Sequence, residues 1–125
     1  MEQNVVGWFE IPVADMDRAK KFYESVFDVE IGINEFGGFK MGWFPSDPTK
    51  SGATGSLVQH EMYKPSLTDG VLIYFSCKDL ANELGRVETS GGEIIRAKTQ
   101  IGEGHGFMAL MKDTEGNRIA LHSNQ

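Results

Sequence analysis

The chain opens with a strand-like segment that leads directly into a helix-like segment. Two sets of side chains alternate along Gly7–Val13, which is the period-two pattern of a strand with two different faces. Asp15 then stands where a helix N-cap is expected, and Asp17 follows in the first turn. Apolar residues after it recur at i, i+3, i+4 and i+7, so the pattern predicts an amphipathic helix with one stripe against a sheet. The stripe residues are Ala19, Phe22, Tyr23 and Val26.

The same order of segments restarts near residue 71. Val71–Cys77 reads as a strand, Asp79 as an N-cap, and the apolar spacing after it predicts a helix that ends at Gly91 and Gly92. Asp113–Gly116 has the composition of a hairpin turn. Further strands are expected at Val29–Asn34, Phe39–Phe44, Ser56–Met62, Glu93–Arg96, Phe107–Met111 and Arg118–His122.

A shift of about 64 residues superposes the two halves of the pattern. The sequence therefore predicts an α+β fold with two tandem βαβββ modules, forming a curved eight-stranded, incompletely closed barrel-like sheet around a cleft. We expect one domain over residues 1–125. Its first module covers 4–62, a linker covers 63–70, and the second module covers 71–124.

Composition narrows the classes of partner. The net charge of −6 and the scattered Lys and Arg residues argue against nucleic acid, which needs a basic surface. No apolar run approaches the roughly 20 residues that span a bilayer, so no membrane partner is expected. The N-terminus lacks the features of a secretory signal, and the one cysteine, Cys77, fits a reducing compartment. These features together predict a cytoplasmic protein.

Two end motifs give the chain a resemblance to a known family. They are D-x-D-R-A-x-x-F-Y from Asp15 to Tyr23 and D-x-E-G-N-R from Asp113 to Arg118. Together with the doubled pattern, they resemble the vicinal oxygen chelate superfamily of glyoxalase I, bleomycin-resistance proteins, extradiol dioxygenases and fosfomycin-resistance enzymes. The resemblance covers nearly the whole chain, but fold membership does not fix the chemistry.

In metal-using members of that family, four His, Glu or Gln ligands come from the first and last strand of each module. Three of the matching positions here hold Trp8, Leu72 and Ala120, and the fourth lies in Ser56–Glu61. Indole, isobutyl and methyl groups cannot coordinate a metal, so we expect no standard metal site and no cofactor. A divalent metal at a displaced site remains an open alternative. Its candidate ligands are His60, His105 and His122, with Glu10 or Glu61.

Alternation places Glu10, Tyr74 and His122 on the face that the family uses for its site. Trp8, at a family ligand position, is expected to stack on an aromatic or cationic ligand. The simpler interpretation is that Glu10 lies at the rim and that His122 is hydrogen-bonded to a backbone group. The full set of expected ligand-binding residues is Trp8, Glu10, Trp43, Leu72, Tyr74, Met108 and His122.

Two functions follow from these features. The first is a protein that binds a small, partly apolar or aromatic molecule in the cleft without the standard metal. The alternative is a glyoxalase-like lyase or isomerase, either metal-dependent or using Glu10 and His122 as its acid and base. The sequence favours binding over catalysis and leaves both open. A homodimer is expected, because each small sheet leaves an open edge strand.

Overall fold

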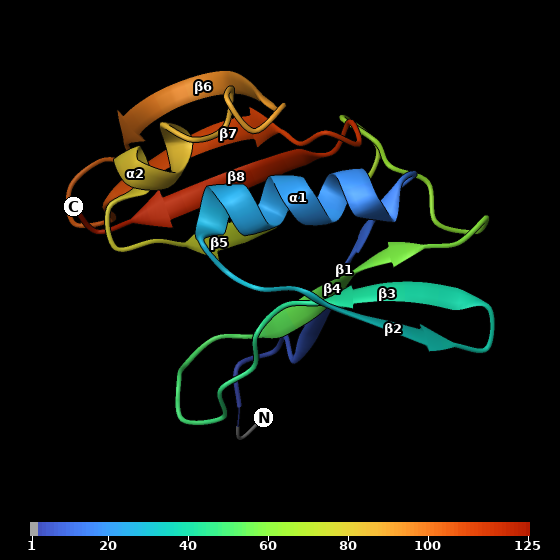
Figure 1. Ribbon diagram of the computed structural model, residues 1–125. Helices are drawn as coiled ribbons and strands as arrows, with labels where there is room; N and C mark the ends of the chain where they lie inside the picture. The colour runs from blue at the N-terminus through green and yellow to red at the C-terminus, as the bar shows by residue number, and fades with distance from the viewer. Residues whose placement is uncertain (1–2) are drawn as a thin grey trace.

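The computed structural model describes residues 3–125, which form eight strands and two helices (Figure 1). No helix in this range is long and apolar enough to cross a membrane. In chain order the elements are β1 (Trp8–Pro12), α1 (Met16–Phe27), β2 (Gly32–Phe36), β3 (Phe39–Trp43), β4 (Thr54–Gln59), β5 (Tyr74–Ser76), α2 (Leu80–Leu84), β6 (Glu93–Gln100), β7 (Phe107–Lys112) and β8 (Arg118–Ser123).

The strands form two four-stranded sheets with the same order of elements. The first sheet runs β1-β4-β3-β2 and the second runs β5-β8-β7-β6. In each sheet the first strand pairs in parallel with the last, and the other pairings are antiparallel. The α+β class is therefore confirmed. The expected eight-stranded sheet is instead two separate sheets, and they do not close into a barrel.

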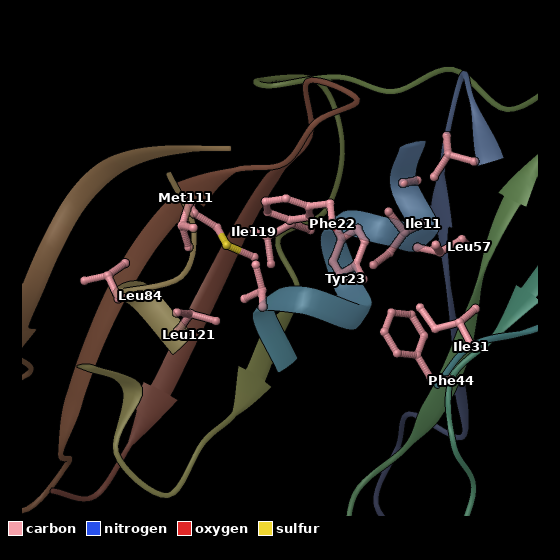
Figure 2. Close-up of a cluster of buried hydrophobic side chains, with 14 of the residues drawn as sticks. Ile11, Phe22, Tyr23, Ile31, Phe44, Leu57, Leu84, Met111, Ile119 and Leu121 are labelled. Atoms are coloured by element: carbon pink, nitrogen blue, oxygen red, sulfur yellow. The ribbon is translucent and has the colours of Figure 1, made fainter. Parts of the chain in front are cut away.

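Helix α1 forms as its sequence pattern predicts. The side chain of Asp15 accepts a hydrogen bond from the backbone N–H of Arg18 at 3.1 Å, and Asp28 ends the helix in the left-handed conformation. All four predicted stripe residues are buried, together with Met16. Figure 2 shows the Phe22 and Tyr23 rings between side chains of the first sheet and side chains of the second. The sheets therefore share one core, which lies on the helix side of each.

The largest differences from the prediction in the second half concern α2, β5 and β6. α2 ends at Leu84, although the apolar spacing continues to the buried Val87, which is reached through turns. β5 covers only Tyr74–Ser76, whereas β6 extends to Gln100. At Gly92 a Cβ atom would lie 2.6 Å from the Phe22 ring and 2.7 Å from the Lys112 carbonyl oxygen. This glycine therefore allows a close approach to α1 rather than marking the helix end.

The turn between β7 and β8 connects the two halves of the chain. The buried carboxylate of Asp113 accepts a hydrogen bond from the Tyr23 hydroxyl at 2.6 Å and another from the backbone N–H of Asn117 at 2.9 Å. The Asn117 side chain donates to the Pro12 carbonyl at 2.7 Å. Burial, reinforced by Asp113, raises the pKa of Tyr23 well above its usual value, so this hydroxyl remains a donor.

Glu115, in the same turn, caps the start of α1 from outside the helix. Its Oε1 accepts hydrogen bonds from the backbone N–H groups of Ala14 at 2.8 Å and Asp15 at 2.7 Å, and Arg18 donates to Oε2 at 2.7 Å. Burial of Glu115 opposes its ionisation, but the hydrogen bonds from Arg18 and the backbone outweigh it and lower its pKa. The D-x-E-G-N-R motif thus holds the second sheet to the first strand and helix.

We expect the Tyr23→Phe substitution to lower the free energy of unfolding by roughly 1–3 kcal/mol, because it removes a donor from a buried carboxylate. Urea-induced unfolding measures the change. Tyr74→Phe is the matched control, since Tyr74 is 50% exposed and its substitution should change stability by less than about 0.5 kcal/mol. Equal effects of the two substitutions would show that the Tyr23 hydrogen bond does not stabilise the fold.

Candidate functional site

The candidate site lies on the face of the first sheet that is turned away from α1. Ile11 and Leu57 point from this sheet into the shared core (Figure 2), so their neighbours along each strand point to the opposite face. The pairing register places Glu10 and Trp43 on either side of Ser56. We call the group of Trp8, Glu10, Trp43 and Ser56 the tryptophan face.

Two indole rings cover the middle of this face. Trp8 and Trp43 meet edge to face, with ring centroids 5.5 Å apart and an interplanar angle of 71°. Each residue is 40% exposed. Ser56, from the central strand β4, is fully buried, and its Oγ has no hydrogen-bond partner among residues 3–125. A buried hydroxyl without a partner is rare in proteins and requires an explanation.

Glu10 forms the polar border of the tryptophan face. Its Oε1 accepts a hydrogen bond from the Tyr63 hydroxyl at 2.8 Å, and this bond raises the pKa of Tyr63. The Tyr63 ring meets Phe39 edge to face, and Phe39 stacks on His60 at 4.1 Å. Tyr63 was expected only in a linker, and no periodic pattern in the sequence marks it as a site residue.

The other predicted site residues lie on the second sheet. Met108 pairs with His122, and Tyr74 pairs with Ala120 on the same face. Leu72 precedes β5. The ring Nε2 of His122 is 2.8 Å from the backbone oxygen of His105, and because a carbonyl only accepts, Nε2 is the donor.

The structure therefore places the predicted acid and base on different sheets. Glu10 lies on the first sheet with Tyr63 as its partner, and His122 lies on the second sheet with a backbone partner. Among residues 3–125 no hydrogen bond or ion pair joins them. The backbone contact of His122 matches the simpler interpretation of this histidine.

Within residues 3–125 no group of three or more His, Cys, Asp and Glu side chains is placed to hold a metal ion. His60 Nδ1 accepts from the backbone N–H of Met62 at 3.1 Å, so its ring is oriented by the chain. Trp8 and Ala120, at two of the positions that the resemblance assigns to ligands, have no donor atom suited to a metal.

The thiol also lacks the properties of a nucleophile. Burial, with a further contribution from nearby Glu83, raises the pKa of Cys77 to about 12. At neutral pH it is protonated, and a protonated thiol is a poor nucleophile. Cys77 therefore adds no chemistry to either face.

Comparison with known proteins supports the fold and the family. Residues 5–121 match the model of the Glyoxalase/Bleomycin resistance protein/Dioxygenase superfamily. A glyoxylase/bleomycin resistance protein/dioxygenase domain from Frankia sp. EAN1pec superposes with a TM-score of 0.75 at 13% identity, covering 99% of this chain and 100% of the Frankia chain. An antibiotic binding protein from a Streptomyces species superposes with a TM-score of 0.65 at 20% identity, covering 100% of this chain and 99% of that one.

Glyoxalase I from Zea mays is also similar, with a TM-score of 0.68 and 15% identity. The match covers 94% of this chain but only 45% of the maize chain, so the present chain spans about half of that enzyme. A comparison with curated proteins finds no match. At these levels of identity the solved structures establish the fold and leave the ligand open.

Trp8 and Trp43 are the two tryptophans of the chain, so intrinsic tryptophan fluorescence reports only on the tryptophan face. We expect acrylamide to quench the emission of the native protein efficiently, because both rings are 40% exposed. In Trp8→Phe and Trp43→Phe the remaining indole should stay accessible to the quencher. Emission that is shielded from acrylamide until the protein unfolds would contradict this placement of the rings.

Proposed function

The chain belongs to the Glyoxalase/Bleomycin resistance protein/Dioxygenase superfamily, and we propose that it binds a small, partly aromatic molecule on the tryptophan face without the standard metal. The main support is the exposed Trp8–Trp43 pair above the buried, unpartnered hydroxyl of Ser56. Large aromatic rings with a few polar groups beneath them are typical of small-molecule sites. The similar protein from Streptomyces is an antibiotic binding protein, which adds support to a binding role.

The groups around the rings favour a planar ligand with a positive charge. An indole face attracts both aromatic rings and cations. Glu10 supplies a carboxylate at the border of the face, and the whole chain has a net charge of −6. The Ser56 hydroxyl, which has no partner within residues 3–125, is a group that can donate a hydrogen bond to a ligand or accept one from it.

A second copy of the chain would complete the cleft. The helix sides of both sheets are filled by the shared core, so the predicted ligand residues of the two sheets do not face one another across that core. A homodimer that sets the tryptophan face of one copy against the second sheet of the other would bring Tyr74, Met108 and His122 over the ligand. Leu72 would then border the same cleft.

The alternative of an acid–base enzyme has less support. Glu10 and His122 lie on different sheets and have separate hydrogen-bond partners within one chain. No observation in the single chain favours this alternative. Binding without catalysis is therefore the function that we propose.

We expect Trp8→Ala to weaken binding of the planar aromatic cation proflavine by about 1–3 kcal/mol, because half of the stacking surface is lost. Fluorescence titration of chelator-treated protein measures the affinity. Glu10→Gln should weaken the binding of proflavine but not the binding of the anionic aromatic 2-naphthoate, since only the cation is attracted by the carboxylate.

Ile33→Ala is the matched control for Trp8→Ala. Ile33 is 41% exposed on the same sheet, but its pairing with Gly42 places it on the helix side. Its removal should leave the affinity unchanged. Binding that is equal in both variants, or that appears only after zinc, nickel, cobalt, manganese or ferrous iron is added, would overturn the proposed site.

The dimer is tested by sedimentation equilibrium. We expect a particle of twice the chain mass of 13.9 kDa over the concentration range of the binding experiments. A particle of 13.9 kDa throughout that range would contradict a cleft built from two copies. The proposal would then be reduced to ligand binding on the tryptophan face of a single chain.

A further inference from the structure

A cavity separate from the indole rings lies where the two sheets approach each other. It has a volume of about 240 Å³. Its walls come from β1, from the segment that joins β4 to β5, and from the start of β8. This volume is below the roughly 300–1,000 Å³ of pockets for drug-sized ligands, so the cavity suits a smaller molecule.

Two cationic and two anionic side chains line this cavity without pairing with each other. They are Lys64, Arg118, Glu10 and Asp69. Glu10 is hydrogen-bonded to Tyr63, and Asp69 accepts from Thr68 at 3.5 Å. None of the ion pairs in residues 3–125 involves any of these four side chains.

Arg118 is the least satisfied of these groups. Its Nε is buried and has no hydrogen-bond partner in the described part of the chain. Its β-sheet neighbour Lys112 is itself a cation, which forms an ion pair with Glu93 at 3.0 Å. A buried guanidinium N–H without an acceptor is costly, and a carboxylate is the acceptor that best fits the planar donors of an arginine.

We propose that this cavity binds a free amino acid with a small apolar side chain. The carboxylate of the ligand would accept hydrogen bonds from Arg118, with Lys64 adding positive charge at the rim. Its ammonium group would be held by Glu10 and Asp69. The matched charges explain why a zwitterion is preferred over a simple anion, which the two carboxylates would repel.

Apolar side chains form the rest of the lining. Ile11, Ile73 and Ile119 line the cavity on both sides of the junction between the sheets, with Pro12 and Val71 beside them. These groups favour an aliphatic side chain over a polar one. L-Alanine and L-valine are therefore the appropriate probes, and this site shares only Glu10 with the site proposed above for an aromatic ligand.

Binding is measured by nuclear magnetic resonance titration of the ¹⁵N-labelled full chain at constant ionic strength. Each single-charge analogue of L-valine lacks one of its charged groups: 3-methylbutanoate lacks the amine, and 2-methylpropan-1-amine lacks the carboxylate. We expect L-valine to bind about tenfold or more tightly than either analogue, with shifts at the amides of Val71, Asn117 and Arg118. The Arg118→Met substitution should weaken L-valine binding by a similar factor.

Arg96→Met is the control, because it removes the same charge from an exposed site outside the cavity. It should leave the affinity unchanged. If Arg118→Met fails to fold, Lys64→Met tests the contribution of positive charge to L-valine binding. Lys64 is exposed, so its substitution should weaken binding without changing the fold. The inference is overturned if neither amino acid gives saturable shifts at the cavity, if an analogue binds equally well, or if Arg118→Met and Lys64→Met leave binding intact.

Discussion

The buried hydrogen bond from Tyr23 to Asp113 is the interaction on which the arrangement of the two sheets depends. It joins the helix of the first half to the turn between the last two strands, over 90 residues of sequence. Asn117 and Glu115 extend the same connection to β1 and to the start of α1. Because these polar groups are buried, they satisfy each other in only one relative placement of the halves, which gives the connection its specificity.

This placement determines where a ligand can bind. The helix sides of both sheets are occupied by one core that contains the α1 side chains, as Figure 2 shows. The opposite faces are therefore left for function, and on the first sheet that face carries two half-exposed indoles. The open edges of the sheets and these aromatic rings are consistent with a cleft that two copies of the chain enclose.

Local features of the fold were readable from the sequence, but the relation between distant parts was not. The stripe of α1 and the caps at Asp15 and Asp79 follow from periodicity and side-chain chemistry, and the structure confirms them. Val87 satisfies the apolar spacing without being helical, because burial can be reached through turns.

The placement of distant residues could not be predicted in the same way. Alternation along the strands assigned Glu10 and His122 each to one face of a strand, but this pattern cannot show whether the two sheets face each other. Tyr63 carries no periodic signal, so its contact with Glu10 emerges only in three dimensions.

Glu10 belongs to both of the sites that we propose. It borders the indole rings through its position on β1, and it also lines the cavity that contains Arg118. If Glu10 attracts a cation at the tryptophan face, its carboxylate is less available to an ammonium group in the cavity. Two ligands that draw on the same charge must influence each other's affinity equally, because binding free energies are reciprocal. The junction between the sheets would then link an aromatic ligand and an amino acid through a single side chain, without any change in the fold.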